Sequence, residues 1–137
     1  KPFRIITEFC AGGCCFELLH QRDELELEWA QQHKMCVDVA LAMDYLHKFS
    51  PQIIHRELKT MNLLLARPVL KGGDVPIVKV SDFGLSRMRD RSDMHRNMNI
   101  MAEPFTWMAP ELYHKGATYD EKVDVFAYGM ILFEIAC

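Results

Sequence analysis

Three short strings in a fixed order constrain this chain more than its overall composition does. They are HRELKTMN at residues 55–62, DFG at 82–84 and WMAPE at 107–111. The first string precedes one predicted strand and the second follows another, so both fall on loops between regular elements. Catalytic residues concentrate on loops that a rigid scaffold positions, and the strings therefore predict an active site.

The hydrophobic pattern predicts a mixed α+β fold in one compact domain or a piece of one. The predicted elements are a β-rich run at 4–9, a short helix from Cys14 to about His20, a long helix from about Glu28 to His47, strands at 63–65 and 77–80 with a turn at 71–74, and a last helix at 123–137. The expected buried stripe of the long helix is Cys36, Val39, Ala40, Met43 and Leu46. Residues 85–105 show no sustained period, which predicts a mobile loop.

The last helix has a distinctive start and composition. Thr118 and Glu121 have the spacing of a capping box, which predicts the beginning of the helix. Residues 123–137 are apolar on almost every side. A helix of that kind is expected at the centre of a globule.

Charge and cysteine content exclude several classes of protein. The net charge of −3 is mild, basic residues form no block, and no apolar run reaches the roughly 18 residues of a membrane span. We therefore expect no nucleic-acid partner and no membrane segment. The five cysteines are an odd number without a paired C-x-x-C pattern, which supports neither a disulfide framework nor a zinc site. A reducing, intracellular and cytoplasmic location is the expectation.

Together the three strings resemble the catalytic half of a eukaryotic-type protein kinase, closest to the tyrosine-kinase-like group of Ser/Thr kinases. The resemblance covers essentially all 137 residues. It implies the mainly helical large lobe of that fold, with a small β-ribbon that carries the active-site loops. It also implies a partial domain over 1–137, from hinge to central helix, without the small lobe and the final helices. The ends of the chain read as those of an excerpt truncated on both sides.

The resemblance assigns chemical roles to single residues. In the family, the DFG carboxylate and the catalytic-loop asparagine hold magnesium on the phosphates of ATP, which implies these roles for Asp82 and Asn62. Lys59 matches the lysine that faces the transferred phosphate in Ser/Thr kinases. Asp124 matches an aspartate that braces the catalytic loop from the central helix. The implied cofactors are ATP and Mg²⁺, and the implied partner is a protein substrate.

The first string departs from the family at its catalytic position, where Glu57 stands in place of aspartate. The two carboxyl groups have nearly the same unperturbed pKa, roughly 4.3 and 3.9, so acid strength does not separate them. One extra methylene displaces the carboxylate by about 1 Å, and such a misplacement can lower a rate on the order of 100-fold. Two interpretations stay open, an impaired but active enzyme and a pseudokinase.

The segment before the first helix resembles the strand and hinge that bind adenine in kinases. By that match Thr7 is the gatekeeper, while Glu8 and Cys10 offer backbone hydrogen bonds to the base. Leu64 is the implied floor of the pocket.

Two neighbouring cysteines follow this segment. Cys14 opens the predicted short helix, where amide N–H groups favour a thiolate. We expect Cys14 to be the most reactive thiol, or Cys15 if the turn is one residue longer.

Substrate class rests on mixed signals. Lys59 and the string at 107–111 favour Ser/Thr substrates, whereas the proline of Glu103-Pro104 falls where tyrosine kinases carry one. One alternative is a pseudokinase that acts as a scaffold or allosteric partner. Another is a small-molecule phosphotransferase, which the string at 107–111 speaks against. We expect the isolated chain to be inactive, because the glycine-rich loop and strand lysine of kinases precede the hinge.

Overall fold

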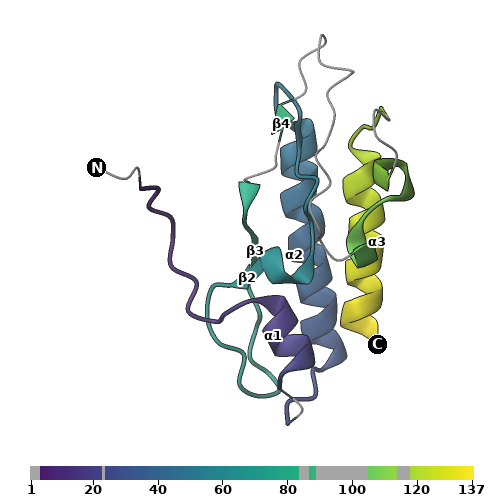
Figure 1. The fold of residues 1–137 in the computed structure, drawn as a ribbon. Helices are drawn as coiled ribbons and strands as arrows, with labels where there is room; N and C mark the ends of the chain where they lie inside the picture. Colours follow the sequence, from purple (N-terminus) through teal and green to yellow (C-terminus); the bar gives the residue numbers. More distant parts are fainter. Residues whose placement is uncertain (1–3, 23, 84–86, 89–104, 114–117) are drawn as a thin grey trace.

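The computed structural model describes residues 4–22, 24–83, 87–88, 105–113 and 118–137. Its helices and short antiparallel strands confirm the α+β class (Figure 1). In chain order, with η for a 3₁₀ helix, the elements are α1 (Cys15–His20), α2 (Trp29–Lys48), β1 (Ile53–Ile54), η1 (Thr60–Asn62), β2 (Leu63–Leu65), β3 (Val78–Val80), β4 (Arg87–Met88), η3 (Phe105–Trp107), η4 (Pro110–Tyr113) and α3 (Lys122–Ala136).

The long helices α2 and α3 lie side by side (Figure 1). Their buried core residues recur at intervals of three or four, as helix packing requires: Met35, Val39, Met43 and Leu46 on α2, and Ala127, Ile131 and Ile135 on α3. The predicted stripe of α2 is thus confirmed for three of its members. Cys36 and Ala40 are only half-buried, at the edge of the stripe. The Tyr128 hydroxyl also donates to the backbone oxygen of Cys36 at 3.0 Å and ties the two helices together.

The β-ribbon formed by β2 and β3 carries the loops that precede and follow it. The strands are antiparallel, with Leu63 opposite Val80. The connection between them is held by Gln31 of α2, whose buried side chain donates to the backbone oxygens of Lys71 at 3.1 Å and Asp74 at 2.8 Å. The end of the ribbon at which the two strands are connected is therefore fixed against α2.

The predicted strand at 4–9 is wrong. Residues 4–10 form no regular element, and Figure 1 shows the segment running away from the helices. Ile5 and Ile6 are more than nine-tenths exposed. A strand needs a neighbour that accepts its backbone hydrogen bonds, and in the described part of the chain no strand pairs with this segment.

The start of α3 also differs from the prediction. The cap residue is Glu121, and the carboxylate of Asp120 accepts the backbone N–H of Lys122 at 2.9 Å. Thr118 lies outside the helix and is exposed, so the predicted capping box does not form. An aspartate two residues before the first free N–H reaches it directly, which satisfies the helix terminus without Thr118.

The apolar helix α3 is not enclosed on all sides. Within the described residues its covered side faces α2, while Val125, Phe126 and Phe133 remain 51%, 41% and 65% exposed. Among the described residues, α3 therefore does not occupy the central position that was expected for it. No helix among the described residues has the length and hydropathy needed to cross a membrane.

The predicted mobile loop at 85–105 lies mostly outside the described residues, as does Glu103-Pro104. Its Arg87 and Met88 form β4, which pairs antiparallel with β1. A two-residue strand is too short to leave a periodic pattern in the sequence, which explains why the prediction missed it.

Candidate active site

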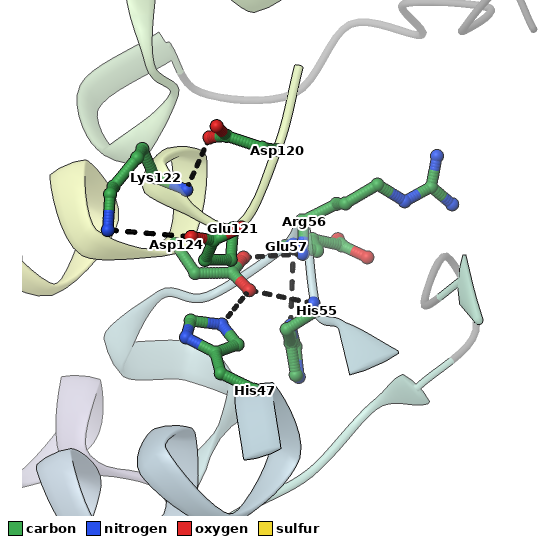
Figure 2. Close-up of polar contacts among 8 residues, drawn as sticks. All are labelled: His47, His55, Arg56, Glu57, Asp120, Glu121, Lys122 and Asp124. Carbon is green, nitrogen blue, oxygen red and sulfur yellow. Dashed lines mark hydrogen bonds and ion pairs between the residues drawn. The ribbon is translucent and has the colours of Figure 1, made fainter. Parts of the chain in front are cut away.

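Asp124 of α3 anchors the beginning of the string at 55–62 (Figure 2). One carboxylate oxygen accepts the backbone N–H of His55 at 2.8 Å, and the other accepts that of Arg56 at 2.7 Å. Nε2 of His47, on α2, lies 2.9 Å from the same carboxylate. Asp124 is 1% exposed, so these interactions are made away from solvent, where each is strong. The predicted bracing contact is confirmed.

The bracing contact holds the loop in an unusual conformation. Arg56 has φ of 69°, a left-handed value that is uncommon outside glycine. Its guanidinium donates to the Tyr119 hydroxyl at 3.1 Å. Asp124 accepts the backbone N–H groups of Arg56 and of the residue before it, His55, which offsets the conformational cost.

His55 connects the first string to the second. Its side chain is fully buried, and Nε2 lies 3.0 Å from the backbone oxygen of Ser81. The imidazole also packs on the ring of Phe83, with the ring centroids 5.3 Å apart. The histidine therefore fixes Ser81 and Phe83 relative to the loop at 55–62 by hydrogen bonding and packing.

Three of the predicted catalytic residues lie together. Lys59 Nζ is 2.7 Å from Glu57 Oε1, and the Asn62 amide donates to the Glu57 backbone oxygen at 2.8 Å. The Lys59 and Glu57 side chains are only 13% and 16% exposed. Water therefore screens this ion pair less than it would a surface pair.

The ribbon register brings the fourth residue, Asp82, to the same end of β2 and β3. Ser81 donates to the backbone oxygen of Asn62 twice, from its N–H at 2.8 Å and from its hydroxyl at 2.9 Å. Asp82 follows directly and is exposed. It has φ of 62°, and non-glycine residues held at such values cluster at functional sites.

The four residues predicted to contact the nucleotide lie on two parts of the chain, three on the segment at 7–10 and one in β2. Thr7 and Glu8 are exposed and Cys10 is half-buried. Glu8 pairs with Lys79 of β3 at 2.6 Å, and this hydrogen bond raises the pKa of the lysine. Leu64 forms a bridge with Cys14, not with the segment at 7–10.

Glu134 is a polar centre that the sequence reasoning missed. Its carboxylate contacts His20, Thr60 and Trp107, three residues from separate segments. The signal was present, because Glu134 is the sole charged residue in the apolar run at 125–137. A charged group is rarely buried unless it is paired, so such a residue predicts partners elsewhere in the chain.

The two neighbouring cysteines differ in accessibility. Cys15 is fully buried, and this burial, with smaller effects of Cys14 and Glu134, raises the pKa of its thiol to about 12. Cys14 is half-buried and precedes the helix, while Cys137 is exposed. Cys15 therefore cannot be the reactive member of the pair.

We expect alkylation at pH 8 to modify Cys137 quickly and Cys15 only after unfolding. With a pKa near 12, only about one Cys15 thiol in ten thousand is a thiolate at that pH. Peptide mass spectrometry of iodoacetamide-treated protein measures each rate. A denatured sample, in which all five cysteines should react, is the control. Native labelling of Cys15 at the rate of Cys137 would contradict this expectation.

Comparison with known proteins adds an independent line of evidence. A family model described as protein tyrosine and serine/threonine kinase matches residues 1–137. The chain is 40% identical over 131 residues to a probable serine/threonine-protein kinase of Dictyostelium discoideum, covering 96% of this chain and 12% of that protein. It is 39% identical over 131 residues to the probable serine/threonine-protein kinase SIS8 of Arabidopsis thaliana, with the same two coverages. It is 38% identical over 135 residues to human serine/threonine-protein kinase TNNI3K, covering 98% of this chain and 15% of that protein.

Proposed function

Because this chain belongs to the protein tyrosine and serine/threonine kinase family, we propose that it carries the metal-binding and substrate-facing residues for ATP-dependent phosphorylation of protein serine and threonine hydroxyls. The observation that carries the proposal is the double hydrogen bond from Ser81 to Asn62. It puts Asp82 at the same end of the ribbon as Asn62, Lys59 and Glu57, the other residues to which the family resemblance assigns catalytic roles.

Asn62 and Asp82 would hold magnesium. The Asn62 amide nitrogen donates to Glu57, so the amide oxygen is the atom that the side chain offers to a cation. Oxygen ligands suit magnesium, which usually takes one or two protein ligands and completes its shell with phosphate oxygens and water. Such an incomplete protein site fits the described residues, where no three His, Cys, Asp or Glu side chains form a metal-binding group. When bound, the metal neutralises charge on the phosphates.

Glu57 and Lys59 would act on the acceptor hydroxyl and the transferred phosphate. The Glu57 carboxylate is the group that can accept the hydroxyl proton, and the Lys59 ammonium can balance charge on the phosphoryl group. Their ion pair at 2.7 Å orients both side chains within one loop.

The substrate class and the nucleotide follow from weaker support. Lys59 and the names of the relatives favour serine and threonine as acceptors. Thr7, Glu8, Cys10 and Leu64 are proposed as the adenine side of the ATP site, on the family resemblance alone. The chain covers about an eighth of the first relatives, so the activity of the whole protein remains part of the proposal. We propose a reducing, intracellular and cytoplasmic location, which rests on the cysteine pattern of the sequence alone.

A second candidate is a pseudokinase that serves as a scaffold or allosteric partner. The Glu57–Lys59 ion pair favours it, because Oε1 of the carboxylate already accepts a hydrogen bond from Lys59 Nζ at 2.7 Å. The longer side chain of Glu57 is the second reason. Both candidates use the same fold and differ only in whether transfer occurs.

The test is a chimera in which this chain replaces the matching segment of the human relative TNNI3K. We expect the chimera to phosphorylate a serine- or threonine-containing substrate. Asp82→Asn should lower the rate at least about 100-fold, because the metal loses its carboxylate ligand. Asp44→Asn is the matched control, because Asp44 is exposed on α2.

Transfer that depends on Asp82 but not on Asp44 supports the enzyme. A folded chimera that binds ATP with magnesium but does not transfer phosphate supports the scaffold. Transfer that survives Asp82→Asn would contradict the assigned metal site.

A further inference from the structure

The side of α2 that is turned away from the core carries a band of apolar and aromatic residues. Two of its large members, Trp29 and Leu41, are 70% and 63% exposed. Contiguous exposed residues of this kind mark surfaces that bind another molecule. We call the following six residues the α2 band: Trp29, Ala30, His33, Val37, Ala40 and Leu41.

Helix geometry divides the α2 band into two flanks. Trp29 and Ala40 are eleven residues apart, which is about three turns, so both lie on one flank. Ala30 and Leu41 have the same separation and lie on the other flank. Each flank therefore has one large and one small side chain, and the order along the helix is reversed between the flanks.

This order of sizes is complementary to itself under a twofold axis. In a symmetric dimer one surface serves both copies, so each contact between two different residues occurs twice. An axis at the level of Met35 runs two α2 helices antiparallel and brings Trp29 beside Ala40 of the second copy. The same axis brings Leu41 beside Ala30 of the second copy, with the two remaining residues of the band at the centre. Large side chains therefore meet small ones.

The largest side chain of the α2 band is held in place by its neighbour. The Trp29 indole packs edge to face on the His33 ring, with the centroids 4.9 Å apart and the planes at 78°. A side chain that is ordered before association loses less conformational entropy when it binds. This contact therefore prepares the surface for a partner.

We propose that the α2 band is a dimerisation surface on which a second copy of this chain packs its own band. A fully covered aromatic side chain buries on the order of 150–250 Å², so the band offers roughly a few hundred Å² per copy. A stable complex buries about 800 Å² per partner. We therefore expect a reversible dimer with a dissociation constant in the micromolar range. The dimer uses no residue of the candidate active site, so the inference goes beyond the proposed function.

Sedimentation velocity of this chain over about 1–200 µM measures the dissociation constant without any nucleotide. The unchanged chain should pass from monomer to dimer within that range. Leu41→Lys and Ala30→Glu should each raise the dissociation constant at least about tenfold. Each substitution places an unpaired charge against an apolar side chain of the second copy, and it does so at two symmetric contacts.

An equimolar mixture of the Leu41→Lys and Ala30→Glu variants is the decisive sample. In a mixed dimer the introduced carboxylate of one copy meets the introduced ammonium group of the other. The native contact between Ala30 and Leu41 persists at the second position. The mixture should therefore associate within about threefold of the unchanged chain. Recovery also shows that both variants are folded.

Two controls separate the α2 band from other exposed surfaces. Tyr45→Lys is the matched control, because Tyr45 is 65% exposed on α2 but lies outside the band. It should leave the dissociation constant within about twofold. Phe133→Glu puts a charge on the exposed side of α3, and the dimer should tolerate it.

A chain that stays monomeric at every concentration would overturn the proposal. So would a mixture of the two variants that does not recover. Loss of association in Tyr45→Lys would overturn it as well, because the effect would then not be specific to the band. Loss in Phe133→Glu would do the same by placing the contact on α3.

Discussion

Replacing Asp124 by alanine is expected to lower the free energy of unfolding by about 3–5 kcal/mol. The substitution removes the acceptor of two backbone N–H groups, those of His55 and Arg56, and leaves both in a buried region. It also removes the partner of His47. A loss of this size is a large fraction of the stability of a typical domain.

Urea unfolding followed by circular dichroism measures the loss. The matched control is Asp44→Ala, which removes an exposed aspartate whose partner Lys48 is 76% exposed, and which should cost less than about 1 kcal/mol. Asp124→Asn keeps one acceptor oxygen and should fall between the two. If Asp124→Ala were as mild as Asp44→Ala, the bracing contact would not hold the string at 55–62.

Glu57→Asp is expected to raise kcat roughly 10- to 100-fold in the chimera that tests the proposed function. The shorter side chain withdraws the carboxylate from Lys59 Nζ, now 2.7 Å away, and restores the geometry for which the family uses aspartate. The KM for ATP should hardly change, because the substitution leaves the proposed nucleotide residues intact. Steady-state kinetics with a serine-containing substrate separate the two constants.

Glu57→Gln is the informative companion to that substitution. It keeps the length of glutamate and removes the proton-accepting group. If Glu57 acts as the base, the rate should therefore fall below that of the chimera that carries glutamate. An enzyme indifferent to both substitutions would place the proton acceptor elsewhere. A rate that rises with Glu57→Asp but is unchanged in Glu57→Gln would mean that only the position of the side chain matters.

Local patterns predicted the elements that are formed by contacts close in the sequence. The long helix was expected at about 28–47 and runs from Trp29 to Lys48, because its apolar residues recur at helical intervals. The ribbon followed from two β-rich runs with a glycine turn between them. The bracing role of Asp124 came from the family resemblance, since nothing in its neighbourhood signals the distant loop.

The features that the sequence analysis predicted wrongly or did not predict share a physical cause. Each of them depends on contacts that are formed only in the folded chain. The run at 4–9 has strand-forming residues but pairs with no strand in the described part of the chain. Glu134 gains its importance from Thr60, 74 residues away. The beginning of α3 depends on which of several nearby acidic side chains reaches the free N–H groups, a matter of local geometry that spacing alone does not settle.

The contact between Asp124 and His55 also sets the order in which the site can be completed during synthesis. The two residues are 69 positions apart, and chains are made from the N-terminus at about 5–20 residues per second. Some 3 to 14 seconds therefore separate the appearance of the loop from that of the carboxylate that fixes it, by the same rate. Throughout that interval the ribosome carries a loop whose backbone N–H groups still lack their acceptor. Conditions that slow elongation should therefore lengthen the exposure of the nascent loop to chaperones and proteases.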